Sequence, residues 1–373
     1  MKELKELWQR CFDDSDEFVD MYFRLCCSHR TAMYIRSGGA IVSSLQMPCY
    51  TMTFEGTGIP VAYIAGACTH PGFRGRGLMA RLLVESLNRM VRENILLSVL
   101  IPAGSGLADY YAKAGFAYAF FRSPARQSVL PAEQGTSAVA VGEGVLHVEY
   151  TTVLEPAVAN YFIEKTRCRP NYIQHTIADL EAVVADLRMS GGSVSVARSA
   201  GRIVGVLFAY PDGGVLKITE WLADDDSLRN RLIDSAARHY RQPEAVWFEL
   251  PVRSVGEQAF GMARIINAKA ILSLYAAAHP REQAAIHLTD EQLALNNGYY
   301  YISNGACTFI PEAAEGKDLE LKGKHSNVAE GKHLELKGKH SNVAEGKHLE
   351  LTTHELSVMI FDRIRPYMSL MLE

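Results

Sequence analysis

The sequence lacks the features that mark several large classes of protein. Its 373 residues contain no run of about 18 uncharged apolar residues, so we expect no membrane-spanning helix and no membrane partner. Residues 1–6 are charged and do not resemble a signal peptide. The net charge is only −4, from 38 basic and 42 acidic residues, which argues against nucleic acid as a partner.

Cysteine is present, but not in a pattern that suggests cross-links. The seven cysteines include no Cys-x-x-Cys motif, and Cys26 and Cys27 are adjacent. We therefore expect reduced thiols in a cytoplasmic protein, with neither a disulfide framework nor a zinc site.

The length and a hydrophobic content of 48% predict two or three domains with substantial cores. We place the domains at residues 1–144, 145–258 and 259–373. The first begins with two amphipathic helices and three short strands. A near-continuous apolar strand at 59–68 follows, then a helix at 78–93, a strand at 96–102, a short helix and a strand at 117–122.

The second block repeats this order of elements. It has helices at 156–166 and 177–189, three strands, an acidic run before a helix that ends near residue 240, and a strand at 245–250. The third block predicts a helix at 267–278, a final helix from 355 that is interrupted or ended near Pro366, and strands at 284–288, 292–295, 299–303 and 306–310. Asn297-Gly298 is a hairpin signal between them. We expect a mixed α/β (α+β) fold.

A period of 15 residues appears in the third block. GKDLELKGKHSNVAE at 316–330 is followed by GKHLELKGKHSNVAE at 331–345, and a third copy begins at 346. The period is too short for a solenoid unit, and the polar content cannot form a core. We expect a solvated excursion at about 316–351. A metal site built from its histidines is the alternative, but ligand spacings are lacking.

The motif that points to chemistry is Arg74-Gly75-Arg76-Gly77-Leu78. It lies between a predicted buried strand and a predicted helix. Glycines allow a sharp turn with close approach to a ligand, and the N–H groups and helix N-terminus favour an anion such as pyrophosphate. The arginines can add charge-assisted hydrogen bonds. An ordinary glycine-rich turn is the alternative interpretation.

The order of elements around this turn resembles the GNAT acetyltransferase superfamily. Members hold the pyrophosphate of acyl-CoA on an Arg/Gln-x-x-Gly-x-Gly/Ala turn, which Arg74, Gly77 and Leu78 match, while Met79 replaces the last small residue. The resemblance implies acetyl-CoA as co-substrate, without a metal. Backbone atoms of Ala67, Cys68 and Thr69 would pair with the pantetheine amides.

The sequence from Pro71 to Met79 and the three-part layout are similar to the Eis (enhanced intracellular survival) family. That family joins a working GNAT domain, a degenerate GNAT-like domain and a sterol-carrier-protein-like domain. The resemblance implies two GNAT-type mixed sheets flanked by helices, and a sterol-carrier-like domain at 259–373. It also implies a homo-oligomer, with a hexamer as the family's form.

Two residues carry the chemistry in this resemblance. Tyr111 matches the tyrosine that protonates the CoA sulfur, with neighbouring Tyr110 as the alternative. The predicted strand has no carboxylate, so the base implied by the Eis resemblance is the α-carboxylate of Glu373, with Glu55 as another candidate. A solvated terminus is the competing interpretation.

Two functions fit these observations. The first is an acetyl-CoA-dependent N-acetyltransferase acting by direct attack of a primary amine, which is an aminoglycoside-like compound, a polyamine or a lysine. The second is a non-enzymatic acyl-CoA or lipid-binding protein that uses the sterol-carrier-like domain. The complete Arg74–Leu78 turn favours the first.

Overall fold

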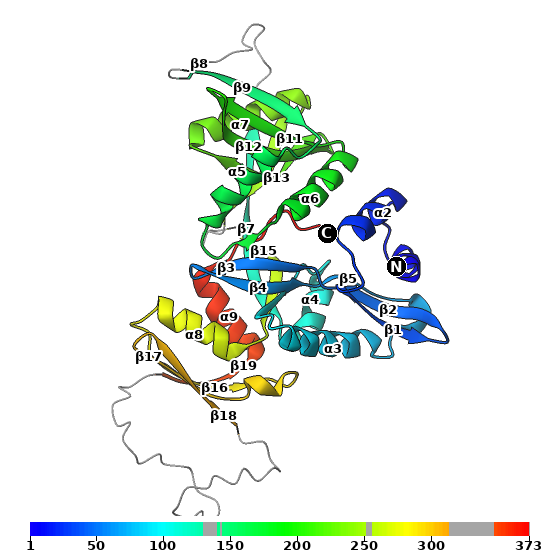
Figure 1. Ribbon diagram of the computed structural model, residues 1–373, viewed down its shortest axis with the longest axis vertical. Coiled ribbons are helices and arrows are strands. Elements are labelled where there is room, and N and C mark those ends of the chain that lie inside the picture. Colours follow the sequence, from blue (N-terminus) through cyan, green and yellow to red (C-terminus); the bar gives the residue numbers. More distant parts are fainter. Residues whose placement is uncertain (130–139, 142–143, 251–255, 313–346, 373) are drawn as a thin grey trace, which may run out of the picture.

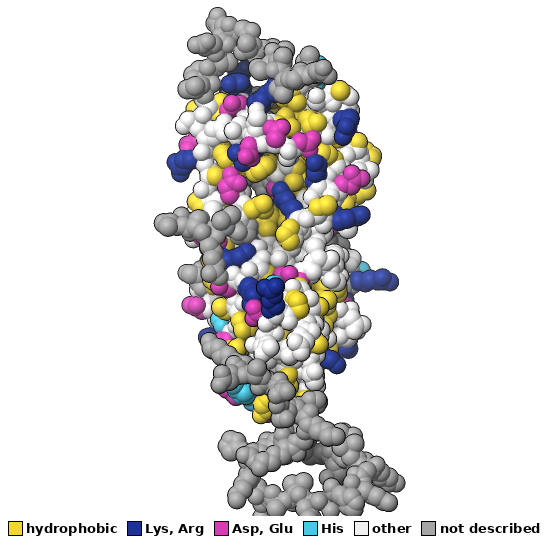
Figure 2. Space-filling model, turned by 90° about the vertical axis from the view of Figure 1, so that its left-hand side faces the viewer, with side chains coloured by type: hydrophobic (Ala, Val, Ile, Leu, Met, Phe, Trp, Pro, Cys, Tyr) yellow, Lys and Arg dark blue, Asp and Glu magenta, His cyan; other side chains and the backbone are white. Residues whose placement is uncertain are grey.

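The computed structural model describes residues 1–129, 140–141, 144–250, 256–312 and 347–372. Three units lie along the long axis of the molecule, with the second at the top of Figure 1, the first in the middle and the third at the bottom. Helices and mixed sheets alternate, which confirms the predicted fold class. On the face in Figure 2, basic and acidic side chains are interspersed.

The first unit begins with two helices whose apolar stripes face its sheets. α1 is Lys2–Cys11, and α2 is Asp16–Leu25, with the Ser15 hydroxyl accepting a hydrogen bond from the Phe18 N–H at 3.1 Å. The other elements of the unit are β1 (Ala32–Ser37), β2 (Ala40–Gln46), β3 (Cys49–Phe54), β4 (Thr57–Tyr63), β5 (Ala65–Thr69), the 3₁₀ helix η1 (Pro71–Phe73), α3 (Leu78–Arg92), β6 (Leu97–Leu100), α4 (Ser105–Ala112) and β7 (Ala117–Ser128).

The apolar stretch at 59–68, expected as one strand, is divided between two sheets. β4 pairs with β3 and, in parallel, with β6, whereas β5 pairs with β2 in a separate three-stranded sheet. The division lies near Gly66, whose φ of +55° favours glycine, and a Cβ there would stand 2.0 Å from the Trp8 ring. Gly66 therefore lets the chain pass from its pairing with β6 to its pairing with β2, while Trp8 of α1 packs against the glycine.

The second unit follows the predicted order. α6 and the first strands of its meander match the expected positions closely, and α7 follows the acidic run as predicted. The elements are β8 (Ala140–Val141), β9 (Gly144–Thr151), α5 (Pro156–Arg167), β10 (Ile173–Gln174), α6 (Ile177–Met189), β11 (Ser193–Ser199), β12 (Arg202–Asp212), β13 (Val215–Ala223), α7 (Asp226–His239) and β14 (Glu244–Glu249).

Two strands join the units into one sheet. Within the described residues, twelve strands are hydrogen-bonded in the order β10-β3-β4-β6-β15-β7-β14-β13-β12-β11-β9-β8. β15 (Gln258–Ile265) lies between β6 and β7, although the sequence places nearly all of it in the third block. The second half of β7 pairs with β14. The expected boundaries at 144/145 and 258/259 therefore do not coincide with boundaries between sheets.

The third unit contains α8 (Ala268–Ala278), β16 (Ala284–Thr289), the 3₁₀ helix η2 (Ala294–Asn296), β17 (Gly298–Ser303), β18 (Ala306–Pro311), β19 (Lys347–Thr352) and α9 (Thr353–Ile364). The strand expected at 292–295 is wrong, because this stretch leads into η2. The Asn-Gly turn that closes a tight hairpin is Asn304-Gly305, both at positive φ, between β17 and β18. It is not Asn297-Gly298.

The repeats are only partly described. Residues 313–346, which hold most of the predicted solvated excursion, lie outside the described residues. The start of the third copy was also expected to be solvated, and this expectation is wrong. It forms β19, which pairs in parallel with β16 along its whole length. Strand pairing and the half-buried Leu349 and Leu351 give this copy a place in the sheet that its composition did not indicate.

A tail follows α9 and crosses between units. Arg365, at φ +48°, ends the helix before Pro366, which confirms the predicted interruption near this residue. The tail, red in Figure 1, runs between the first and second units toward α2. Tyr367 exchanges backbone hydrogen bonds with Asn171 and Ile173, at 2.8 and 3.1 Å.

Ser369 then fixes the tail against the second unit. Its hydroxyl donates to the buried Glu220 carboxylate at 2.6 Å and lies 3.0 Å from the Tyr172 hydroxyl, and its carbonyl accepts from His175 Nε2 at 2.9 Å.

A buried polar network ties the third unit to the first. The fully buried Arg264 of β15 donates to the Asp290 carboxylate at 2.8 Å and to the Ala114 carbonyl at 2.6 Å. Asp290 also accepts from the Asn296 amide at 2.8 Å and from the Leu293 N–H at 2.9 Å. A buried charge is tolerated only when its partners satisfy it in this way.

We predict that breaking this pair is costly. Arg264→Met leaves a buried carboxylate without its counter-charge, so the free energy of unfolding should fall by about 3–5 kcal/mol. Urea denaturation of the variant measures this. The control is Arg363→Met, which removes an exposed pair with Glu282 and should cost about 1 kcal/mol or less. Equal losses in the two variants would contradict the assigned role of Arg264.

Candidate active site

The predicted turn lies at the N-terminus of α3 and is open to solvent. Gly75 and Gly77 have φ of +74° and +72°, and a Cβ at either would meet no atom within 4 Å. Gly77 is the N-cap of α3 and supplies no side-chain hydrogen bond to the first turn of the helix. The helix N–H groups therefore face open space without a capping side chain, which suits an anionic ligand.

Both arginines of the turn are exposed and are oriented by backbone carbonyls. Arg74 Nε donates to the Thr69 carbonyl at 3.1 Å, and Arg76 donates to the Gly72 carbonyl at 3.2 Å while lying 5.0 Å from the Phe73 ring. A guanidinium has five N–H donors, so each arginine keeps donors for a phosphate.

The predicted pantetheine strand is an edge strand. β5 ends the three-stranded sheet, and its Thr69 and Cys68 pair with Ser43 and Ser44 of β2. Among the described residues, no strand is hydrogen-bonded to the other edge of β5. The backbone of Ala67, Cys68 and Thr69 can therefore accept an extended ligand as an added strand.

Tyr111 lies on α4, within the same apolar cluster as the start of α3. Its ring is 8% exposed, and Ala67, Met79 and Tyr110 pack against the cluster to which it belongs. Leu78, the first residue of α3, is half-buried. Burial raises the pKa of Tyr111 to about 12, so its hydroxyl is protonated at neutral pH. The structure thus brings the predicted acid and the predicted cofactor turn to one side of the sheet.

Two thiols lie beside the turn. The Cys11 thiol, at the end of α1, donates to the Thr69 carbonyl at 3.5 Å. A hydrogen bond from Cys68, together with the nearby charge of Arg74, lowers the pKa of Cys11 to about 7. The hydrogen bond to Cys11 and burial raise the pKa of Cys68. Cys68 is thus a protonated thiol inside the strand, which fits a packing role.

The two candidates for the base differ in what the structure describes. Glu373 lies outside the described residues. Glu55 is at the β3–β4 turn, with its carboxylate 3.6 Å from His279 Nε2 and its N–H donating to Asn171. At about 3.3 Å per residue, the seven-residue β4 places it roughly 20 Å from β5. Glu55 therefore lies far from the predicted pantetheine strand.

A cluster of tyrosines near β4 was missed in the sequence analysis. Tyr50 of β3 lies 6.4 Å from the Tyr63 ring and 5.7 Å from the His175 ring. The pKa of the buried Tyr22 is raised by burial and by Cys26, Tyr63 and Tyr50 nearby. No signal in the sequence could place His175 and Asp179 beside these tyrosines, because they lie over 100 positions further along the chain.

Two buried polar atoms in this cluster have no hydrogen-bond partner among the described residues. They are the Tyr22 hydroxyl and His175 Nδ1. Burial lowers the pKa of His175, and its Nε2 donates to Ser369, so Nδ1 carries a lone pair. The charge of the Asp179 carboxylate, on α6, also acts to raise the pKa of Tyr50 and of His175. The cluster therefore combines two buried polar atoms that lack a partner with a nearby carboxylate.

No cluster of three or more His, Cys, Asp or Glu suited to a metal occurs in the described part of the chain. No helix there is long and apolar enough to cross a membrane.

Comparison with known proteins gives a family match for the first unit. Residues 1–119 match the model of the acetyltransferase (GNAT) domain. A comparison with curated proteins finds none that matches. The match covers the turn, the edge strand and Tyr111, and therefore the predicted site as far as residue 119.

Solved structures extend the likeness over most of the chain. A probable N-acyltransferase from Enterococcus faecalis is 16% identical, with a TM-score of 0.65, over 84% of this chain and 83% of that one. A GCN5-related N-acetyltransferase from Anabaena variabilis is 17% identical, with a TM-score of 0.63, over 84% of this chain and 83% of that one. Eis1 from Mycobacterium abscessus is 10% identical, with a TM-score of 0.61, over 84% of this chain and 82% of that one. At these identities the likeness establishes a shared fold.

Proposed function

We propose that this protein is an acetyl-CoA-dependent N-acetyltransferase that acts on a primary amine. The observation that carries the proposal is the open Arg74–Leu78 turn at the start of α3, next to the free edge of β5, inside a GNAT domain match. The likeness to Eis1 supports an Eis-like enzyme, with a sterol-carrier-like third unit and a homo-oligomeric, possibly hexameric, assembly as parts of the proposal.

The residues present fit acetyl-CoA. Gly75 and Gly77 leave the space for a pyrophosphate that any Cβ would reduce, and Arg74 and Arg76 supply its counter-charge. The edge of β5 would hold the pantetheine arm. When bound, the co-substrate supplies a thioester whose acetyl group moves to the amine.

The protein residues would manage protons around that transfer. Tyr111 is protonated at neutral pH and would hold a proton for the departing sulfur. The amine must lose a proton to become a nucleophile, and the α-carboxylate of Glu373 is proposed to accept it, directly or through water.

The amine would enter from the side of the tyrosine cluster. Aromatic faces and the Asp179 carboxylate attract a cationic amine, which supports a polyamine, an aminoglycoside-like compound or a lysine as the acceptor. Acetyl-CoA turnover with a panel of these amines, followed by thiol release, tests the proposed activity. No turnover with any member would argue for a binding protein instead.

The turn should determine affinity for CoA. Arg74→Ala combined with Arg76→Ala removes two charge-assisted contacts, worth about 1.5–3 kcal/mol each, and should weaken binding at least tenfold in calorimetric titration. Gly77→Val should also weaken it, because valine is strained at φ +72° and occupies the open space at the start of α3. The matched control is Arg81→Ala, on the same helix but paired with Glu85. Unchanged affinity in all folded variants would refute the assignment.

Tyr111 should affect turnover rather than binding. Tyr111→Phe keeps the buried ring and removes the proton, so kcat should fall by about a hundredfold or more while the Kd for CoA stays the same. Steady-state kinetics and calorimetry separate the two. Tyr110→Phe is the control and should retain activity. A larger loss from Tyr110→Phe would transfer the acid role to that residue.

The chain end should matter for the same step. Adding two glycines after Glu373, or deleting Glu373, displaces the α-carboxylate by one or more residues and should lower kcat without changing the Kd for CoA. An N-terminal addition of equal length serves as the control. If a C-terminally extended enzyme turns over normally, the base lies elsewhere, and His175 becomes the next candidate to replace.

A further inference from the structure

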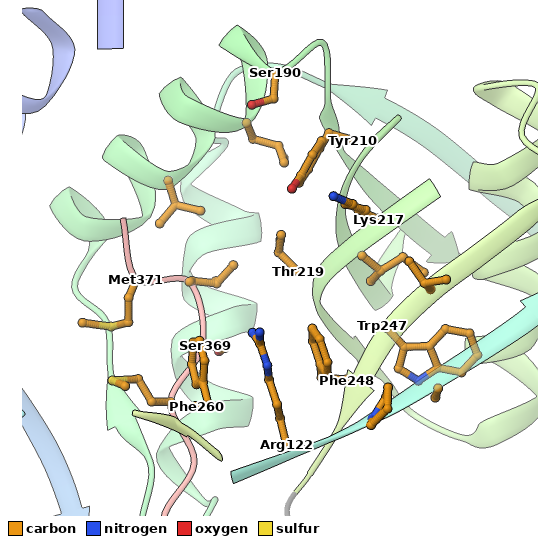
Figure 3. Close-up of a pocket in the computed structure, with 18 of the residues that line it drawn as sticks. Arg122, Ser190, Tyr210, Lys217, Thr219, Trp247, Phe248, Phe260, Ser369 and Met371 are labelled. Carbon is orange, nitrogen blue, oxygen red and sulfur yellow. The ribbon is translucent and has the colours of Figure 1, made fainter. Parts of the chain in front are cut away.

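A cavity of about 590 Å³ lies beside the second unit. Figure 3 shows it between β13, β14, α6 and the C-terminal tail. It opens where the parallel strands β13 and β14 separate after two residue pairs, and β4 and β6 separate in the same way after three. Lys217 in its wall pairs with Asp212, and Arg122 is stacked between Phe248 and Phe260. Both cations have partners within the protein, so the cavity by itself does not identify a ligand.

A pair of thiols beside the turn offers reactive chemistry that acetyl transfer does not use. Trp8 of α1 packs over Gly66 of β5, where its ring fills the space that a Cβ of the glycine would need. Cys11 lies three residues after Trp8 on the helix, and Cys68 lies two residues after Gly66 on the strand. Residues at these spacings share one face of a helix and one face of a strand. The same packing therefore brings Cys11 against Cys68, and the two thiols are hydrogen-bonded.

Cys11 has the features of an attacking thiol. It is half-buried at the last residue of α1, whereas Cys68 is buried within an apolar cluster. The hydrogen bond from Cys68 and the charge of Arg74 lower the pKa of Cys11 to about 7, so the thiolate is present at neutral pH. When Cys11 gives up its proton, the Thr69 carbonyl keeps its hydrogen bond from Arg74 Nε, at 3.1 Å. Ionisation of Cys11 therefore leaves no backbone acceptor without a donor at this point.

Cys68 is placed to complete a disulfide. Its Sγ lies 3.6 Å from the Ser44 hydroxyl, which can donate to the sulfur as that sulfur loses its proton. The hydrogen bond to Cys11 and burial raise the pKa of Cys68, so it stays a thiol until Cys11 has reacted. Cys68 therefore does not compete with Cys11 for an oxidant, and it stands next to the sulfur that an oxidant would modify first.

We propose that Cys11 and Cys68 form a modification site for peroxides, in which Cys11 is oxidised first and Cys68 closes a reversible disulfide. The Cys11 thiolate attacks a peroxide oxygen and breaks the O–O bond, which gives a sulfenic acid and a hydroxide that takes up the proton Cys11 had released. The Cys68 sulfur then attacks the Cys11 sulfur, the S–O bond breaks, and hydroxide leaves as water with the Cys68 proton. Two thiols thus lose two electrons and two protons, and one hydrogen peroxide becomes two waters.

Other thiols of the chain are less suited to this chemistry. Burial raises the pKa of Cys26 to about 12 and the pKa values of Cys27 and Cys307 to about 11, so they are protonated at neutral pH. Cys49 is exposed, but partial burial of its thiol raises its pKa as well. Peroxide should therefore distinguish Cys11 from these cysteines.

Oxidation of the full chain with one equivalent of hydrogen peroxide, without acetyl-CoA, tests the proposal independently of acetyl transfer. Trypsin releases Cys11 in a peptide at 11–24 and Cys68 in a peptide at 37–74. After alkylation of free thiols, mass spectrometry should find these two peptides linked, and dithiothreitol should separate them. The Cys11 thiol should be lost at least tenfold faster than the thiol of Cys168, an exposed cysteine outside the pair.

Three variants assign the two roles. Cys68→Ala should leave Cys11 as a sulfenic acid that dimedone traps, and Cys11→Ser should leave Cys68 unmodified. Cys49→Ser is the control and should still form the link, because Cys49 shares the peptide at 37–74 but is not the reacting thiol. Melting temperatures show whether each variant is folded. If Cys68→Ala does not fold, the linked peptides of the unaltered chain still decide the question.

The proposal is overturned by any of three results. The first is that folded, peroxide-treated protein contains no link between the peptides at 11–24 and 37–74. The second is that Cys49→Ser abolishes the link, which would assign it to Cys49. The third is that Cys68 in Cys11→Ser is oxidised as fast as the link forms in the unaltered chain, because Cys11 would then not be the attacking thiol.

Discussion

The buried ion pair between Arg264 and Asp290 is the constraint on which the arrangement of the units depends. Arg264 belongs to β15, which enters the sheet of the first unit, while Asp290 follows β16 of the third. The same guanidinium holds the Ala114 carbonyl at the end of α4, and Gly115, at φ +84°, leaves room for it at 3.0 Å from a hypothetical Cβ. The position of Tyr111, three residues earlier, therefore depends on a residue 150 positions away.

The C-terminal tail is the second long-range element. Its Ser369 satisfies the buried Glu220 and orients His175, so tail and second unit complete each other's hydrogen bonds. The tail also packs against the core shared by the first and third units, through Leu372, and forms one wall of the cavity. The tail, for which the sequence also allowed a solvated terminus, thus contacts the second unit, the core shared by the first and third units, and the cavity.

Local signals in the sequence predicted most helices and the turn, since amphipathic spacing and glycines report local conformation. They could not predict where β4 ends, because the break depends on Trp8 packing over Gly66. The hairpin was assigned to Asn297-Gly298 because both Asn-Gly pairs look alike locally, and only the pairing of β17 with β18 selects Asn304-Gly305. β15, the tyrosine cluster and the cavity arise from contacts between distant segments, which periodicity does not report.

The two separated strand pairs show how one backbone arrangement can support two kinds of site. Each consists of parallel neighbours that part after two or three residue pairs and leave backbone and side chains facing a gap. In the first unit the chain after the gap has glycines and arginines, and a helix start without a side-chain cap. In the second it has three aspartates and a capped helix. Because the strands are alike, the two units differ in the helix start that follows, which favours an anion in the first unit and disfavours one in the second.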